Sequence, residues 1–332
     1  MFIVSNYTLA VIFTFITMLC WGSWANTQKL AARTWRFELF YWDYVLGIVL
    51  FAILSAFTLG SSGELGRDFL TDVRQAELQA VWNAFLGGII FNLANILLVA
   101  AIAIAGMSVA FPLGIGIALI LGVVVNYIGA PKGDPVLLFA GVAMVAIAIV
   151  LDAIAYSKKS KVKQKVTAKG ILLSVVAGLL MSLFYRFVAI SMSGNFEYPE
   201  SGLLTPYTAL VIFSAGIFVS NILFNTVLMR KPIEGDPVPY KIYFGEGFKT
   251  HITGILGGLI WGLGMLFSII AAGKAGYAIS YGLGQGATLI GALWGVFIWK
   301  EFKGASRTVN IMLVFMFLLF MSGIGMIILA GI

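Results

Sequence analysis

Two tryptophans and an amide lie together at the end of the first apolar run of the sequence. Trp21 and Trp24 are three residues apart, and Asn26 follows two positions later. Residues three apart share one face of a helix, so both indole rings are expected on the same side. An indole face can stack on a planar ligand while an amide reads the edge of that ligand by hydrogen bonds. These residues favour a site for a polar, uncharged ring; the alternative is an interfacial tryptophan belt.

Two carboxylates enter the second apolar run. Glu38 follows Arg36 and is expected near the membrane interface, whereas Asp43 lies about a turn deeper. Residues five apart do not share a helix face, so a paired acid site is not predicted. Because a carboxyl group inside a bilayer is costly, it marks a functional site. Asp43 is therefore predicted to carry a transported proton, with Glu38 as the second candidate; a structural role for Asp43 is the alternative.

Further polar groups interrupt later apolar runs. Asn92 and Asn95 are three residues apart, and Gln285 lies in the glycine-rich stretch 282–286. Arg186 lies inside another run, where a cation costs at least about 2.5 kcal/mol, so it is expected to meet a ligand or carboxylate, or to snorkel outward. The predicted substrate-binding residues are Trp21, Trp24, Asn26, Asn92, Asn95, Arg186 and Gln285.

The composition defines the elements that must position these side chains. The chain has 332 residues, of which 61% are hydrophobic and 11% are charged. Soluble proteins carry about a quarter charged residues, so a water-soluble enzyme is excluded. A spanning helix needs about 20 apolar residues, and the sequence predicts an all-α polytopic membrane protein. About ten transmembrane helices are expected, near 8–27, 40–60, 80–104, 107–129, 135–157, 170–193, 205–229, 251–273, 277–299 and 308–331.

The basic residues predict the orientation of these helices. With ten spans, 16 of the 21 Lys and Arg fall on one side, four fall on the other, and Arg186 lies within a span. Cytoplasmic loops are enriched in Lys and Arg, so the richer side is expected to be cytoplasmic. This places both termini outside and the lysine-rich segment 158–169 inside. Since the cations flank apolar runs, the net charge of +7 does not indicate nucleic acid as a partner.

The same segment divides the chain into two similar halves, 1–157 and 170–332. A shift of 170 positions places Leu86-Gly87-Gly88 on Leu256-Gly257-Gly258, Ala105-Gly106 on Ala275-Gly276, and Leu113-Gly114 on Leu283-Gly284. Five spans in each half make the repeat inverted, which is the architecture of secondary transporters. The alternative is a chance match between two stretches rich in glycine, alanine and leucine.

The fourth and ninth runs open with matched segments, 111–116 and 281–286. Pro112 and the clustered glycines are expected to weaken both helices and free backbone groups near the middle of the membrane. Close helix packing through small residues is the alternative.

The motifs resemble one known family. The runs 20–30 and 35–44, together with 91–95, 111–116 and Asn126-Tyr127, are similar to the ureide permease family of the drug/metabolite transporter superfamily, which is related to the glucose/ribose porters. The resemblance implies ten helices in two inverted five-helix repeats. It also implies uptake, coupled to protons, of ureides such as allantoin or of oxo-substituted nitrogen heterocycles such as uracil. The second half is less similar, so a sugar substrate of the glucose/ribose porter type is the alternative.

Other function classes lack the residues they need. His251 is the single histidine and Cys20 the single cysteine, so neither zinc chemistry, nor a disulfide scaffold, nor another cofactor is predicted. A membrane-embedded enzyme or a passive channel is a remoter alternative. The expected partners are a small-molecule substrate, a proton and membrane lipid, with a second copy of the chain, in a homodimer, as a further candidate. The expected location is the cell (inner) membrane.

Overall fold

The computed structural model describes residues 1–31, 35–159, 167–233 and 235–332. These residues form helices, and their only β contact is an isolated bridge between Met192 and Leu204. The helices are α1 (Tyr7–Ser23), α2 (Ala25–Leu30), α3 (Phe37–Phe57), η1 (Leu59–Ser61), α4 (Phe69–Gln75), α5 (Leu78–Ala105), α6 (Met107–Gly129), α7 (Pro135–Lys159), α8 (Ala168–Ser191), α9 (Pro206–Arg230), α10 (Tyr240–Gly245), α11 (Phe248–Ala275), α12 (Tyr277–Gly284), α13 (Ala287–Leu293), η2 (Trp294–Ile298) and α14 (Arg307–Leu329).

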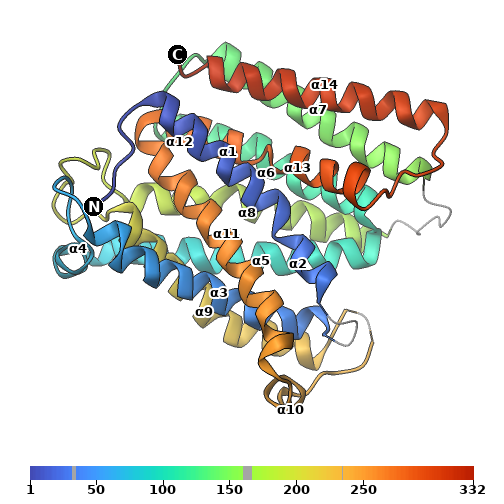
Figure 1. The fold of residues 1–332 in the computed structure, drawn as a ribbon, viewed down its shortest axis with the longest axis horizontal. Coiled ribbons are helices and arrows are strands. Elements are labelled where there is room, and N and C mark those ends of the chain that lie inside the picture. Colours follow the sequence, from blue (N-terminus) through green and yellow to red (C-terminus); the bar gives the residue numbers. More distant parts are fainter. Residues whose placement is uncertain (32–34, 160–166, 234) are drawn as a thin grey trace.

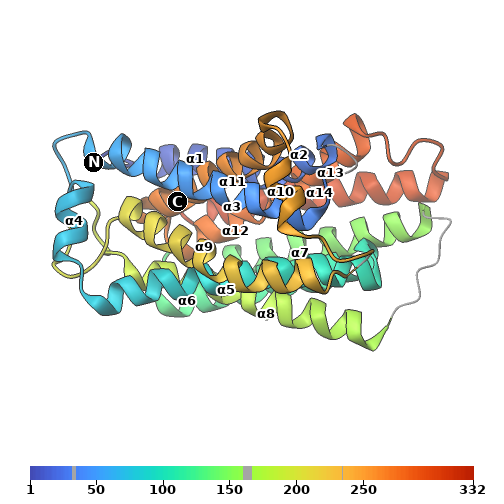
Figure 2. The same cartoon turned by 90° about the horizontal axis from the view of Figure 1, so that it is seen from below.

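Ten segments are long and apolar enough to cross a membrane, which confirms the all-α polytopic prediction. The first span is α1 with α2, and the ninth is α12 with α13 and η2. The spans lie side by side along one direction (Figures 1 and 2). We call the end of the bundle where α7 ends and α8 begins the linker side. The opposite end, where α1 begins and α14 ends, is the terminal side.

Glycines bring the central helices into close contact. A Cβ added to Gly88 on α5 would collide with the carbonyl oxygen of Phe213 on α9. A Cβ on Gly258 of α11 would collide in the same way with the carbonyl oxygen of Tyr44 on α3. Small residues at helix contacts are the usual means of helix association in lipid. As a result, α5 packs on α8 and α9, and α11 packs on α1 and α3.

The helix of two spans is interrupted. The first changes from α1 to α2 at Trp24, and the ninth is broken at Gln285 and Gly286 before a π-helical turn at η2. The expected weakening of the fourth span is not observed, because α6 continues through Pro112. Pro112 lies in the second turn of α6, where the missing N–H removes a single backbone hydrogen bond. Short π-helical turns are frequent at functional sites.

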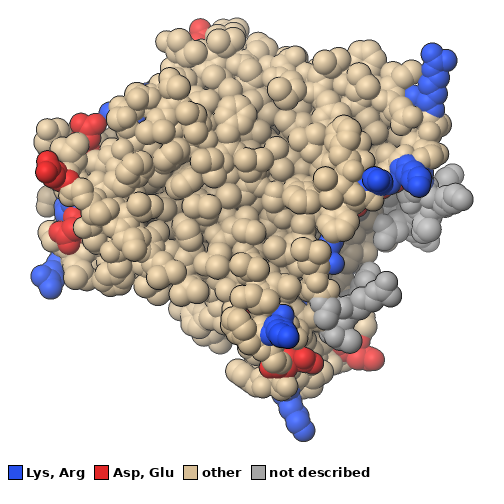
Figure 3. Space-filling view, in the orientation of Figure 1, with Lys and Arg blue, Asp and Glu red and all other residues tan. Residues whose placement is uncertain are grey.

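Charged residues gather at the two ends of the molecule. Figure 3 shows a broad uncharged band between them on the face drawn. Lys29, Arg36 and Lys159 lie at the linker side, whereas Lys132 and Lys274 lie at the terminal side. Within the lysine-rich segment predicted at 158–169, residues 160–166 lie outside the described residues, as does Arg33. The uncharged band is the part of the surface that can face lipid.

Candidate functional site

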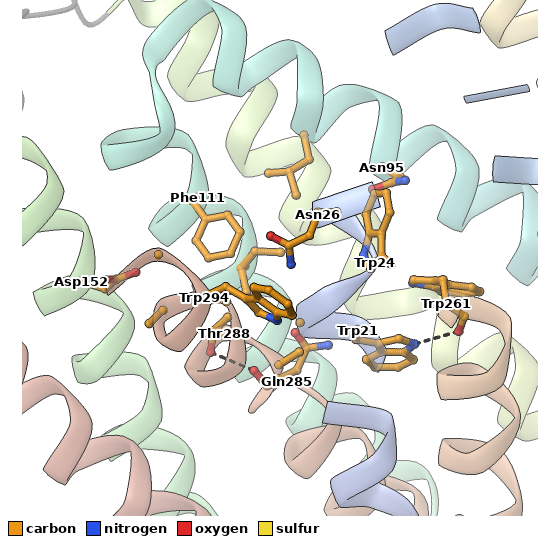
Figure 4. Close-up of a pocket in the computed structure, with 18 of the residues that line it drawn as sticks. Trp21, Trp24, Asn26, Asn95, Phe111, Asp152, Trp261, Gln285, Thr288 and Trp294 are labelled. Carbon is orange, nitrogen blue, oxygen red and sulfur yellow. Dashed lines mark hydrogen bonds between the residues drawn. The ribbon is translucent and has the colours of Figure 1, made fainter. Parts of the chain in front are cut away.

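A pocket of about 320 Å³ lies among the first, third to sixth, eighth and ninth spans. This volume is at the lower end of the ~300–1,000 Å³ typical of small-molecule sites. Figure 4 shows Trp24, Asn95 and Trp261 on one side of the pocket and Phe111 and Asp152 on the other. Among the predicted site residues, the pocket is lined by Trp21, Trp24, Asn26, Asn95 and Gln285. The interrupted first and ninth spans both contribute to it.

Aromatic rings form the wall of the pocket. Trp21 stacks on Trp261 with ring centroids 5.9 Å apart and an interplanar angle of 14°. Phe91 packs against Trp261 as well, with the two ring centroids 4.4 Å apart. Trp21 fits here because Gly264 and Gly284 have no side chains: a Cβ on either would lie within 3 Å of the indole. The two glycines therefore set the position of the stacked pair.

Several uncharged polar groups in the pocket have no partner among the described residues. Asn95 donates to Tyr41 at 3.2 Å, but its Oδ1 accepts no such hydrogen bond. The side-chain amide of Gln285 and the indole N–H groups of Trp24 and Trp261 also make none within the part of the chain described, and all four residues line the pocket. These groups leave donors and acceptors free for a ligand.

The mouth of the pocket is at the linker side. Trp299 donates its indole N–H to Asn26 Oδ1 at 2.6 Å, which joins the end of the ninth span to α2. Lys29 pairs with Glu301 at 2.7 Å and lies 4.9 Å from the ring centroid of Trp299. The side chain of Lys29 is 48% exposed, so these lining residues reach the surface. Asn26 therefore lies at the mouth of the pocket rather than at its centre.

A buried layer closes the pocket towards the terminal side. Tyr185 on α8 hydrogen-bonds with Ser268 on α11 at 2.9 Å, and Ser280 on α12 donates to the carbonyl oxygen of Ser268 at 2.6 Å. Tyr281 donates to the carbonyl oxygens of Ala118 and Met181, both at 3.2 Å. All four hydroxyl-bearing side chains are buried. The site is therefore open at one end and sealed at the other.

Asn92 lies outside this pocket. Its Oδ1 accepts from Tyr41 at 2.9 Å, and its Nδ2 donates to Ser220 at 2.9 Å and to the carbonyl oxygen of Ile217 at 3.3 Å. Tyr41 also accepts from Asn95, so Asn92 holds the hydroxyl group that positions Asn95. The structure brings Asn95 to the pocket and places Asn92 in the contact between helices.

Arg186 also lies away from the pocket. It lies near the terminal-side end of α8 and donates to the carbonyl oxygen of Gly129 at 3.4 Å. Gly129 is the last residue of α6, so the guanidinium group contacts a carbonyl at a helix C-terminus. A cation is favourable at this end of the helix dipole. The contact places Arg186 at a helix end rather than in the pocket.

Asp43 and Glu38 lie near the linker-side end of α3, outside the pocket lining. Asp43 accepts hydrogen bonds from Trp35 at 2.9 Å and Tyr243 at 2.7 Å, and its Oδ1 lies 2.8 Å from Nδ1 of His251. Burial raises the pKa of the Tyr243 phenol, and the bond to Asp43 raises it further. Glu38 pairs with Arg36 at 2.7 Å. Asp43 is thus a buried carboxyl group that joins α3, α10 and α11.

The pocket contains residues that sequence reasoning missed. These are Trp261, Trp294 and Trp299, which lie in or beside apolar runs, and Asp152, which lies near the end of the run 135–157. Trp294 and Trp299 lie near a span end, where tryptophan is common at the membrane interface. Their position in the sequence therefore did not distinguish them as binding residues. Among the described residues, no group of three His, Cys, Asp or Glu is placed to hold a metal ion.

Comparisons with known proteins agree with this fold. The sequence model of the ureide permease family matches residues 40–169 and 157–330. Ureide permease 2 and Ureide permease 1 of Arabidopsis thaliana are each 24% identical to the chain over 98% of its length and 98% of their own. A solved structure, titled only as the crystal structure of a protein, superposes with a TM-score of 0.63 at 15% identity, covering 97% of this chain and 96% of that one. This last likeness concerns the fold alone.

The family match extends over nearly the whole membrane-spanning region, from the second span to the tenth. A permease moves solutes across a membrane, and the pocket that is open at one end suits that task. The chain is therefore an integral, multi-pass membrane transport protein rather than an enzyme, and it belongs to the ureide permease family.

Proposed function

We propose that the protein is a secondary active transporter of small, polar, uncharged metabolites, with ureides and nucleobase-type rings as its substrates. The pocket carries this proposal, since it offers the aromatic faces of Trp21 and Trp261 beside the free amide groups of Asn95 and Gln285. Amides bind neutral polar groups without the desolvation cost of a charged partner. The two Arabidopsis relatives are named ureide permeases, which supports ureides as the substrate class.

The transport mechanism we propose is alternating access by two inverted five-helix repeats, 1–157 and 170–332. Gly106 and Gly276, 170 positions apart, end α5 and α11 with φ/ψ of 81°/156° and 89°/150°. The close glycine contacts also correspond: Gly88 meets α9 as Gly258 meets α3. Equivalent halves of this kind can exchange conformations, which opens the site to each side in turn.

The proposed orientation has the linker side in the cytoplasm and both termini outside the cell membrane. It is supported by the Lys and Arg residues at the linker side. The pocket is then open to the cytoplasm and closed to the outside, which is the state in which an importer releases its substrate.

Proton coupling is proposed to involve Asp43, with Glu38 beside it. A carboxyl group enclosed by Trp35, Tyr243 and His251 joins α3 to α10 and α11, so a change in its charge would alter how these helices pack. Buried carboxyl groups in membrane helices are the usual proton carriers of transporters. Glu38 forms an ion pair with Arg36, and this pair lies at the same end of α3 as Asp43.

Uptake by purified protein in liposomes tests the proposed function. Radiolabelled allantoin or uracil should accumulate inside when the outer solution is made acidic, and the accumulation should collapse with the pH gradient. Equilibration without accumulation would indicate a passive channel. Accumulation of a radiolabelled monosaccharide, without accumulation of allantoin or uracil, would favour the sugar alternative, for which stacking on Trp261 is also suited.

A further inference from the structure

An acidic side chain of α7 lies inside the pocket without a protein partner. Asp152 lines the pocket, and its Oδ1 is buried with no hydrogen-bond donor among the described residues. Figure 4 shows it across the pocket from Asn95 and Trp24. A buried polar atom of a native protein normally has a partner, so a free one in a pocket points to a ligand.

The polar side chains near Asp152 bind the carboxylate of Glu301 instead. Tyr156, one turn along α7, donates to Glu301 at 2.5 Å, and Lys29 pairs with Glu301 at 2.7 Å. Burial alone would raise the pKa of Glu301, but these two hydrogen bonds outweigh it and hold that pKa below its usual value. Glu301 is therefore ionised, and its negative charge acts on Asp152.

No described residue supplies a positive charge to Asp152. The titratable side chains that line the pocket with it are Lys29, Tyr156 and Glu301, whereas α6, α8 and α13 contribute none. The one titratable side chain of α14, which packs along α7, is Arg307 at its first residue, and it does not line the pocket. An isolated carboxylate in such a place pays a large desolvation cost, which a proton removes.

We propose that Asp152 binds a proton together with the substrate, and that its neutral carboxyl group then pairs with an N–H and the adjacent C=O of that substrate. A neutral carboxyl group has an O–H donor beside an acceptor oxygen, whereas the ionised form only accepts. Ureides and oxo-substituted nitrogen heterocycles present an N–H beside a C=O, which is the complementary pair. The proton comes from water at the mouth, forms the O–H bond of Asp152, and returns to water when the substrate leaves.

This assignment rests on the proposed function and adds a second proton-binding group, at the substrate itself, to the one proposed at Asp43. Ionised Asp152 would make one hydrogen bond fewer and would face the substrate C=O with a second negative oxygen. Substrate binding and proton binding therefore strengthen each other, by the same factor in both directions. Such positive coupling is what a transporter needs to move both in one direction.

The Asp152→Asn variant tests the proposal, because an amide has the same donor and acceptor pair as a neutral carboxyl group but does not titrate. Affinity for allantoin and uracil would be measured by calorimetry at pH 5.5 and pH 8. The wild type should bind about tenfold more tightly at the lower pH. Asp152→Asn should bind equally at both, near the tighter value, and Asp152→Ala weakly at both. Asp236→Asn, in an exposed linker-side loop, is the matched control and should behave as the wild type.

A measurement on the wild type alone keeps the proposal falsifiable if a variant fails to fold. At pH 8, calorimetry in two buffers of different ionisation enthalpy should report uptake of up to one proton for each ligand bound. No proton uptake, or an unchanged pH dependence in Asp152→Asn, would overturn the role of Asp152 alone. Failure of the wild type to bind either ligand at any pH would overturn the proposed function and this inference together.

Discussion

Nδ1 of His251 lies 2.8 Å from Oδ1 of Asp43, and this contact joins residues 208 positions apart. Tyr243 reaches the same oxygen at 2.7 Å, and Trp35 donates to Oδ2 at 2.9 Å. The carboxyl group of Asp43 is fully buried. Two donors and an imidazole nitrogen therefore meet one carboxyl group at the linker-side end of the bundle, and they tie α3 to α10 and α11.

The first prediction concerns this group. If Asp43 carries a proton, Asp43→Asn should abolish accumulation of substrate against its gradient while counterflow exchange persists, because exchange needs no net proton movement. Uptake and counterflow in liposomes are the two measurements.

The control separates coupling from helix packing. Tyr243→Phe removes one donor and leaves the carboxyl group in place, so it should lower thermal stability by the ~1 kcal/mol of one hydrogen bond and preserve accumulation. Asp43→Asn protein that still accumulates substrate under a pH gradient would remove Asp43 from the mechanism.

The second prediction concerns the corresponding glycines. Gly106 and Gly276 have positive φ with extended ψ, a region that only glycine occupies readily. Gly106→Ala and Gly276→Ala should each destabilise the protein by about 1–3 kcal/mol, measured as similar falls in the thermal midpoint. Gly116→Ala, where no atom lies within 4 Å of the added Cβ, is the control and should change little. Tolerance of alanine at one of the two positions alone would argue against equivalent halves.

The third prediction concerns topology. On a Cys20→Ala background, a Ser160→Cys variant in the linker should react with a membrane-impermeant maleimide only after the cells are permeabilised. A Ser62→Cys variant, exposed at the terminal side, should react in intact cells. The reverse pattern would invert the proposed orientation.

The helices could be predicted from the sequence because a bilayer requires long apolar runs. The run predicted at 135–157, for example, is the helix Pro135–Lys159. The break in the ninth span was also expected from its glycines. The weakening predicted at Pro112 was wrong, because a proline near the start of a helix is tolerated.

The pocket was harder to predict, because both faces of a membrane helix are apolar and no amphipathic pattern marks the inner one. Asn92 and Asn95 are about 60° apart around α5, enough for one to reach the pocket and the other to face α9. Trp261 and Asp152 come to the site from helices far apart in the sequence. The same is true of the partners of Asp43, which are fixed by tertiary contacts alone.

The central claim is that the pocket between the first and ninth spans holds the substrate. Gln285 and Asn95 expose free amide atoms there, and a hydrogen-bonding group lost from a buried site costs about 1–3 kcal/mol. Gln285→Ala and Asn95→Ala should therefore weaken binding by roughly tenfold. Gln285→Ala should keep a thermal stability near that of the wild type, whereas Asn95→Ala also loses the hydrogen bond to Tyr41. Gln79→Ala, an exposed glutamine at the terminal-side end of α5, is the matched control.

Calorimetric affinity for allantoin in Gln285→Ala, compared with Gln79→Ala, is the most direct test of that claim. The account predicts a Kd about ten times that of the wild type for Gln285→Ala and an unchanged Kd for Gln79→Ala. Wild-type affinity in both variants would contradict it, and would place the substrate outside this pocket.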